Sequence, residues 1–447
     1  MTNVQYLCEA ASQASLPFSR ITSDDLYEFL QLICTRLEEH RSEIVPLAHE
    51  ESNLPLPRLE GELTRTISQF KLFAEDVKSE RWTSVTTTEA IPERAPLPRP
   101  QLVRKLIPIG PVAVFGASNF PLAFSVAGGD TASALAAKCP AIAKIHPAHP
   151  HLSRLIASII SACVVESGLP AGVFAVLDGS ESDARELVEN PHITAVGFTG
   201  SQRVGRILMD IASNRPNPIP VFAEMGSTNP VFVMPGGEMT FANGYAASLT
   251  MGVGQFCTNP GIAVGVNSAE WSAAKVKVRA DIEASPMGKM LTDLIEAAYL
   301  ARAASLTTNS IGDLYGIPQG PQVYEVTAKE FLNNAELHEE VFGPFGVIVT
   351  AESYEEMVQV AEVIQGQLTA TIFAVNNTHR TLIDILTTKV GRLIFDGFPT
   401  GVEVCEAMQH GGPYPATSDS RFTSVGNHAI ARWLRPICLQ NPPSWLD

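Results

Sequence analysis

From residue 106 onward the chain alternates short apolar runs with stretches of helical character, and this alternation restricts the possible folds more than any other feature. The runs PVAVFGA, PAIAKI, GVFAVL and ITAVGFTG are separated by TASALAAK, LSRLIASIISACVVESG and SDARELVEN. Because strands buried on both faces are uniformly apolar and need helical crossovers, the pattern predicts βαβ units around a parallel sheet. A second series follows Pro230, with NPVFVMP, FGVIVTA, ATIFAV and GRLIFDG. The sequence therefore predicts an α/β fold with two parallel-sheet units.

The segment before this alternation has a different pattern of apolar residues. Residues 22–47 have apolar positions at helical spacing, and we expect one amphipathic helix there with Ser23 as its cap. A second amphipathic helix is expected over residues 58–79, RLEGELTRTISQFKLFAEDVKS. The Pro-rich stretch PERAPLPRPQLV indicates a linker or an edge strand.

Composition excludes several classes of partner. The net charge of −16 argues against nucleic acid or an anionic membrane, because phosphate binding needs concentrated Lys and Arg. The most apolar stretch is interrupted by Glu166 and Pro170, so we expect no membrane span. The 7 cysteines form no CxxC pair and no basic and apolar leader opens the chain, which favours a reduced cytoplasmic enzyme.

Cys257, in MGVGQFCTNPG, is compatible with two interpretations. A buried core thiol is the commonest fate of an intracellular cysteine. However, Gly252 and Gly254 weaken the preceding helix, and Pro260 with Gly261 interrupts the chain just after it. A cysteine at such a discontinuity can be reached by a substrate, and a helix N-terminus nearby would favour its thiolate.

Two other polar residues follow predicted strands. Asn119, in FGASNFPLAF, is either a residue tolerated in a turn or a donor to a developing oxyanion. Glu224, in PVFAEMGSTNP, is either a paired structural carboxylate or a general base whose pKa is raised by its apolar surroundings.

Further residues suit a phosphate or a ribose. Gly200 and Ser201 lie between a strand and a helix, where backbone N–H groups can bind phosphate, although the spacing is not GxGxxG. Lys144 ends a strand and is either solvated or bonded to a nucleotide. The prolines that separate His146, His149 and His151 prevent a regular presentation of ligands, so no metal site is expected.

Taken together, the ordered set of motifs resembles the aldehyde dehydrogenase superfamily. Its members are Asn119 in SNFP, Lys144, FTGS at 198–201, Glu224 in AEMGSTNP, Cys257 in GQFCTNPG and EEVFGP at 339–344. Four longer stretches, among them TMGVGQFCT and PTGVEVCEAMQHGGPYPA, are similar to one branch. This branch contains 2-oxoglutarate semialdehyde (2,5-dioxopentanoate) dehydrogenases and bacterial NADP-dependent fatty aldehyde dehydrogenases.

The resemblance implies a different catalytic role for each of Cys257, Asn119 and Glu224. Cys257 would attack the aldehyde carbon, Asn119 and the Cys257 backbone N–H would hold the oxyanion, and Glu224 would activate the water that releases the acid. The product would be a carboxylic acid formed through a thiohemiacetal and a thioester, with 2-oxoglutarate semialdehyde as the expected substrate. The alternatives are a long-chain fatty aldehyde dehydrogenase and, in another class, a catalytically idle binding protein of the same fold.

The resemblance also implies a cofactor, NADP or NAD. Pro147 stands where NAD-preferring relatives commonly have an acidic residue, which gives a mild preference for NADP. The residues expected to line the cofactor are Lys144, Pro147, Phe198, Gly200, Ser201, Glu340 and Phe342.

Finally, the resemblance implies two doubly wound parallel-sheet domains plus a small β arm that joins subunits into a homodimer or homotetramer. The cofactor domain would span residues 1–228 with 406–430, and the catalytic domain 229–405. The arm would comprise residues 95–110 and 431–447. An anionic semialdehyde would need an Arg at the mouth of the substrate tunnel, whereas an acyl chain would need an apolar funnel.

Overall fold

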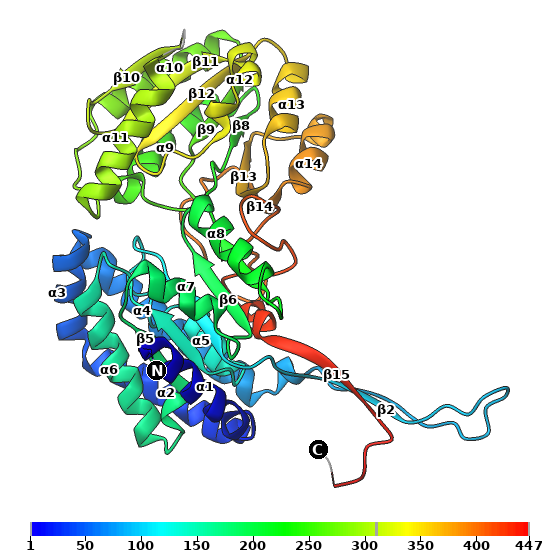
Figure 1. Cartoon of the computed structure of the whole chain (residues 1–447). Coiled ribbons are helices and arrows are strands. Elements are labelled where there is room, and N and C mark those ends of the chain that lie inside the picture. Colours follow the sequence, from blue (N-terminus) through cyan, green and yellow to red (C-terminus); the bar gives the residue numbers. More distant parts are fainter. Residues whose placement is uncertain (1, 309–311, 446–447) are drawn as a thin grey trace.

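The computed structural model describes residues 2–308 and 312–445, which form two large α/β bodies and a projecting arm (Figure 1). The expected domains also include residues 1, 309–311 and 446–447, which lie outside the described residues. Two parallel-sheet units are present, as the alternation predicts.

The first body contains a five-stranded sheet in the order β5-β4-β3-β6-β7, with every pair parallel. Its strands are β3 (Val112–Phe115), β4 (Ala141–Lys144), β5 (Phe174–Leu177), β6 (Ala195–Thr199) and β7 (Val221–Glu224). The connecting helices are α5 (Gly129–Ala136), α6 (Pro150–Glu166), α7 (Glu181–Glu189) and α8 (Gln202–Ser213). The chain runs outward from β3 through β4 to β5 and then crosses back to β6 and β7 on the other side of β3, which makes the β3–β6 boundary the switch point where doubly wound sheets bind ligands.

Four helices precede this sheet, and one of the sequence predictions about them is wrong. They are α1 (Asn3–Ser19), α2 (Ser23–Glu39), α3 (Arg41–Ser52) and α4 (Leu56–Lys78). The single helix expected over 22–47 is broken at His40, whose ring Nδ1 lies 2.8 Å from the Arg36 carbonyl oxygen. The cap is Thr22 rather than Ser23, because the Thr22 hydroxyl accepts the Asp25 N–H at 3.0 Å.

The second body contains a seven-stranded sheet in the order β10-β11-β12-β9-β8-β13-β14. Its strands are β8 (Val231–Val233), β9 (Ile262–Val266), β10 (Asp313–Gly316), β11 (Gln322–Thr327), β12 (Phe345–Ala351), β13 (Gln367–Phe373) and β14 (Val390–Phe395). Its helices are α9 (Glu238–Thr250), α10 (Ala269–Glu283), α11 (Asp293–Thr308), α12 (Ala328–Asn333), α13 (Tyr354–Val363) and α14 (Arg380–Thr387). The edge strand β10 runs antiparallel to β11, whereas the other pairs are parallel.

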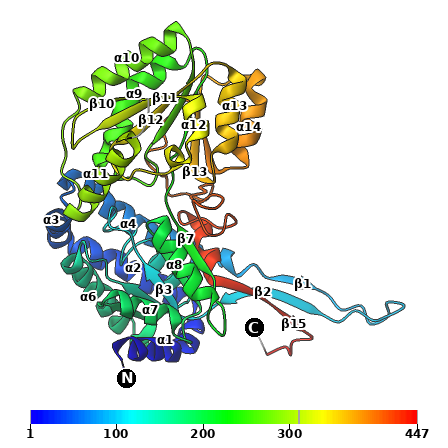
Figure 2. The same ribbon diagram turned by 45° about the horizontal axis from the view of Figure 1, so that its top comes forward.

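A three-stranded antiparallel sheet projects from the first body (Figure 2). It consists of β1 (Thr86–Thr88), β2 (Leu102–Pro108) and β15 (Leu434–Gln440), with Pro108 opposite Leu434 and Leu102 opposite Gln440. Segments from the two ends of the sequence therefore lie side by side in this arm.

After β14 the chain returns to the first body and runs beside β7. The Met225 N–H donates to the Ala416 carbonyl at 2.7 Å, and the Ser418 N–H donates to the Ala223 carbonyl at 3.0 Å. The functional assignment of the three sheets stays a prediction.

Among the described residues, no helix combines the length and the apolar character that crossing a membrane requires.

Candidate active site

The candidate residues lie where the two large sheets face each other. Asn119, Lys144 and Gly200 follow the carboxyl ends of β3, β4 and β6, and Glu224 is the last residue of β7. Cys257 precedes β9 in the second body, and the neighbouring strand β12 is preceded by the EEVFGP segment at 339–344. The two edges therefore bring distant parts of the sequence to one place.

A left-handed turn presents Cys257. Helix α9 ends at Thr250, and Gly252, Val253 and Gly254 follow with φ values of 57°, 58° and 65°. A Cβ atom on Gly254 would lie 2.2 Å from the Gly343 carbonyl carbon, so only glycine fits this close approach. Cys257 is partly exposed, which excludes the interpretation as a fully buried core thiol.

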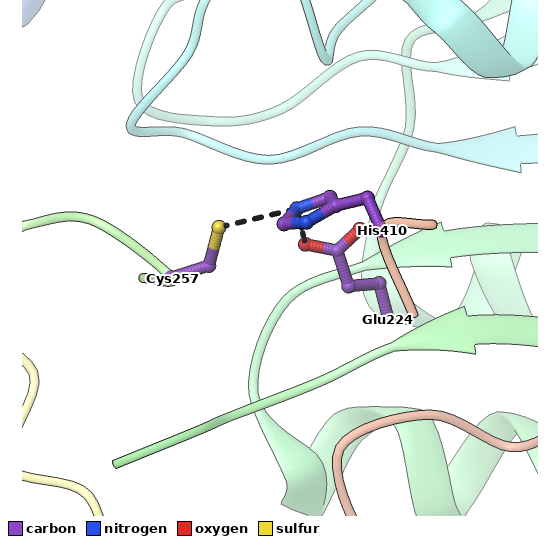
Figure 3. A group of neighbouring side chains, drawn as sticks. All are labelled: Glu224, Cys257 and His410. Atoms are coloured by element: carbon purple, nitrogen blue, oxygen red, sulfur yellow. Dashed lines mark hydrogen bonds and ion pairs between the residues drawn. The ribbon is translucent and has the colours of Figure 1, made fainter. Parts of the chain in front are cut away.

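Cys257 belongs to a cluster that the sequence analysis found only in part (Figure 3). The His410 Nε2 atom lies 3.6 Å from the Cys257 Sγ atom and 3.0 Å from the Glu224 Oε1 atom. The Ser424 hydroxyl donates to Glu224 Oε2. The His410 and Glu224 side chains are 1% and 2% exposed, so the imidazole joins the thiol to the carboxylate in surroundings largely shielded from water.

Two pKa values in this cluster differ from the sequence expectation. Burial alone would raise the pKa of Glu224, but the contacts with His410 and Ser424 outweigh it and hold the pKa below its ordinary value. Burial, Glu224 and Glu340 together raise the pKa of the Cys257 thiol well above its ordinary value. The raised pKa favours the thiol form, whereas a helix N-terminus nearby would have favoured the thiolate, so attack by the sulfur requires a proton acceptor.

Asn119 lies at the turn that carries Cys257. Its side-chain N–H donates to the Gln255 carbonyl at 2.9 Å, and its own backbone carbonyl accepts a hydrogen bond from Arg58 at 2.6 Å. Gln255 in turn is held by Leu291, whose N–H donates to its side-chain oxygen at 3.0 Å. The carboxamide is thus fixed beside the nucleophile segment rather than free in a surface turn.

The expected cofactor residues occupy two groups. Ser201 caps α8 by accepting the Val204 N–H, and Gly200 packs closely on Phe198, which is buried in the core beneath it. Lys144 ends β4 and donates from Nζ to the Ile145 carbonyl at 2.8 Å, with Pro147 three residues further on. This first group follows the strands at the switch point of the five-stranded sheet.

Glu340 and Phe342 form the second group. Burial raises the pKa of Glu340 to about 8, although a hydrogen bond from the Ser227 backbone offsets part of this rise. A Cβ atom on Gly226 would lie 2.3 Å from Glu340 Oε2, so the carboxylate rests on the turn that follows Glu224. Phe342, two residues on, is partly exposed. A buried carboxylate with few partners fits ribose hydroxyl groups, and the start of α8 fits a pyrophosphate.

The sequence analysis missed His410 and Ser424, both from the return segment, where the HGG run was the available signal. Among the described residues, the one group of three possible metal donors is Glu224, Cys257 and His410, with ligand atoms within 4.8 Å of one another. The His146 and His149 rings instead stack at 5.4 Å, and His149 Nδ1 lies 3.1 Å from the Ser153 hydroxyl oxygen.

Comparisons with known proteins identify the family of the chain. A model of the aldehyde dehydrogenase family matches residues 1–412. The chain is 43% identical over 457 residues to alpha-ketoglutaric semialdehyde dehydrogenase 2 of Azospirillum brasilense and 41% identical over 458 residues to alpha-ketoglutaric semialdehyde dehydrogenase of Acinetobacter baylyi. Each alignment covers 99% of this chain and 87% of the relative.

Among solved structures, glyceraldehyde-3-phosphate dehydrogenase GapN from Methanocaldococcus jannaschii, complexed with NADP, has a similar fold. Its TM-score is 0.80 at 18% identity, and the match covers 98% of this chain and 93% of that chain. At this identity the likeness concerns the fold alone.

Proposed function

The chain belongs to the aldehyde dehydrogenase family, and from this premise we propose that it oxidises 2-oxoglutarate semialdehyde to 2-oxoglutarate. The enzyme class, an NAD(P)-dependent aldehyde dehydrogenase, follows from the family. The substrate is proposed from the two relatives at 43% and 41% identity, which carry the name of that semialdehyde.

The observation that carries the proposal is the position of His410 Nε2 between the Cys257 thiol and the Glu224 carboxylate. Because the pKa of the thiol is raised, Cys257 must lose its proton as it attacks the aldehyde carbon. The Glu224 carboxylate, with an oxygen within 4.8 Å of the sulfur, is the acceptor for that proton, and His410 Nε2, 3.0 Å from Oε1, holds the carboxylate in place. The S–C bond forms as the proton leaves the sulfur.

The oxyanion of the thiohemiacetal is held by the Asn119 carboxamide and the Cys257 backbone N–H. Preorganised donors of this kind are worth about 3 kcal/mol each in the transition state. Bound NAD(P) would supply the hydride acceptor that the oxidation of the thiohemiacetal to a thioester on Cys257 requires. Lys144, Ser201 and Glu340 would hold it, with Phe342 at its nicotinamide end.

Hydrolysis of the thioester needs a second proton transfer. After the thiol proton has passed to solvent, the Glu224 carboxylate can again accept a proton. It accepts the proton of the attacking water, the acyl–sulfur bond breaks, and that proton returns to the departing Cys257 sulfur. This completes the conversion of an aldehyde into a carboxylic acid.

The finer cofactor and assembly assignments belong to the same proposal. Pro147 places no negative charge beside a 2′-phosphate, which supports a mild preference for NADP. The projecting sheet supports a homodimer or homotetramer, because β15 has a partner on one side only, in the order β1-β2-β15. Light scattering of the full chain and of a chain ending before Leu434 tests the assembly.

A single set of assays tests the proposed function. NADPH and NADH formation is measured with 2-oxoglutarate semialdehyde, with dodecanal and with no aldehyde, at matched concentrations. The proposal expects the largest kcat/KM with the semialdehyde. A preference for dodecanal would favour the fatty aldehyde alternative, and cofactor binding without turnover of any aldehyde would favour the idle binding protein.

A further inference from the structure

Three charged side chains form a stripe on one face of α4, close to the active-site cluster. Arg58, Glu62 and Arg65 are spaced four and three residues apart, which places them on the same side of the helix. All three are at least partly buried, and Glu62 is only 5% exposed. Charged groups removed from water in this way are retained only where partners compensate for the lost hydration.

The contacts of the stripe engage one oxygen of Glu62 and one Nη group of Arg58, whereas Glu62 Oε2 and Arg58 Nη1 are buried without a hydrogen-bond partner among the described residues. Glu62 Oε1 accepts the Leu122 N–H at 2.9 Å and the Ala123 N–H at 3.1 Å. The Arg58 Nη2 group donates to the Asn119 carbonyl at 2.6 Å. The Arg58 guanidinium also lies 4.9 and 4.8 Å from the centres of the Phe120 and Phe256 rings, which fixes its plane.

Arg65 differs from its neighbours because one edge of its guanidinium has no partner. Its Nε and Nη2 atoms are buried and make no hydrogen bond within the described residues. These two N–H groups lie on the same edge of the guanidinium, which is the edge that binds a carboxylate through two parallel bonds. A buried donor pair without an acceptor is costly unless a ligand supplies one.

The surroundings of Arg65 connect it to the nucleophile. Its guanidinium lies 5.3 Å from the centre of the Phe124 ring, and that ring lies 6.5 Å from the His410 ring, which contacts Cys257. Arg65 is also the neighbour that opposes the rise in the pKa of Cys257, a rise caused mainly by burial. Phe120 packs on Phe124 and Phe256, so an aromatic wall extends from Arg65 to Cys257.

Three carboxylates act on Arg65, namely Glu62, which also acts on Arg58, Glu224, which lies beside His410, and Glu403, and none of them accepts a hydrogen bond from its Nε or Nη2 atom. By contrast, the Arg392 guanidinium, which also acts on Cys257, donates from both Nη groups to the Pro399 and Gly401 carbonyls. Arg65 is therefore the guanidinium near the sulfur with an unused carboxylate-binding edge.

We propose that the free Nε–Nη2 edge of Arg65 binds the carboxylate of the substrate and selects short aldehydes that carry an acid at the far end. The proposal rests on the proposed function and names the residue responsible for its specificity. The carboxylate carbon of 2-oxoglutarate semialdehyde is four bonds from its aldehyde carbon, about 5 Å when extended. The aromatic wall then accommodates the short carbon chain between the two ends.

Substitution of Arg65 by Met tests the proposal by comparing two substrates of equal length. kcat/KM is measured for 2-oxoglutarate semialdehyde and for pentanal, which has five carbons and no charge. The ratio of the two values should fall about 30-fold, mainly through KM, because a charge-assisted bidentate contact is lost. Arg65→Lys should give a smaller fall, since it keeps the charge but not the paired donors.

A second measurement uses a ligand that the enzyme cannot oxidise. 2-Oxopentanoate has the carboxylate and the ketone but a methyl group in place of the aldehyde, and it should inhibit the wild type competitively. Its inhibition constant should rise about as much in Arg65→Met as the KM of the semialdehyde. Arg392→Met serves as the matched control, which should affect both aldehydes to the same extent.

The outcomes separate the two proposals. An equal loss on both aldehydes in Arg65→Met, with unchanged inhibition by 2-oxopentanoate, would show that Arg65 only shapes the site and would overturn its assignment. A wild-type enzyme that prefers pentanal to the semialdehyde would overturn the proposed substrate itself. Loss of selectivity in the Arg65 variants alone supports both.

Discussion

The Nε2 atom of His410 lies 3.0 Å from the Oε1 atom of Glu224, and the two residues are 186 positions apart in the chain. Glu224 ends a strand of the first body, whereas His410 belongs to the segment that returns from the second. The same nitrogen faces the Cys257 sulfur at 3.6 Å. Proton transfer in this site therefore depends on the packing of three separate stretches of chain.

Replacement of Cys257 by Ala should abolish aldehyde oxidation, because no other group in the cluster can form the thioester. Cofactor binding should change little, since the change removes one sulfur atom from a loop. Activity is followed by NAD(P)H absorbance and cofactor binding by fluorescence titration. A variant that retains turnover would show that another residue is the nucleophile.

Replacement of His410 by Asn should lower kcat about 100-fold, because it removes the imidazole that holds the Glu224 carboxylate, the proton acceptor, beside the thiol. The rate of Cys257 alkylation by iodoacetamide near pH 7.5 should fall in parallel. His192→Asn, in the loop before β6, is the matched control and should leave both rates unchanged. Normal alkylation in His410→Asn would exclude its role in positioning the proton acceptor.

Replacement of Glu224 by Gln should slow release of the acid more than formation of the thioester, because the amide cannot accept the proton of the attacking water, whereas the more acidic thiol can lose its proton to solvent. We expect a burst of NAD(P)H close to one equivalent, followed by a slow steady state. Stopped-flow absorbance measures both phases. Wild-type steady-state turnover would contradict the assignment of Glu224 to water activation.

Glu340 should make the stability of the cofactor-free enzyme depend on pH. Its folded pKa is raised from 4.5 to about 8 by burial, so the folded chain retains a proton that the unfolded chain has released. The stability from this group is complete below about pH 4.5 and is lost as the pH rises toward 8. Glu340→Gln should therefore raise Tm relative to the wild type at pH 9 but not at pH 4, as measured by scanning fluorimetry.

Replacement of Pro147 by Glu should shift the cofactor preference from NADP toward NAD. A carboxylate at this position would repel a 2′-phosphate but not a 2′-hydroxyl, so kcat/KM should fall for NADP and change little for NAD. Pro147→Gln is the control for loss of the proline ring. If Glu and Gln affected both cofactors alike, the residue would have no part in the choice.

Much of the fold could be predicted because its signals are local. Uniformly apolar strands alternating with helical stretches indicate parallel sheets wherever they occur, and the strands at 112–115 and 345–351 lie within predicted runs. The same reasoning failed at His40, where a side chain bonded to the Arg36 carbonyl ends a helix that the apolar spacing would have continued.

The sequence by itself determined the α/β class and the set that includes Cys257, Asn119 and Glu224, because each residue stands beside a strand end or a glycine-rich break that is visible locally. Only the tertiary structure decided that His410 lies between Cys257 and Glu224, that the surroundings raise the pKa of the thiol, and that Arg65 has a free edge. These properties depend on which distant groups meet and on what water they exclude. The spacing of residues along the chain does not show which distant groups meet or how much water they exclude.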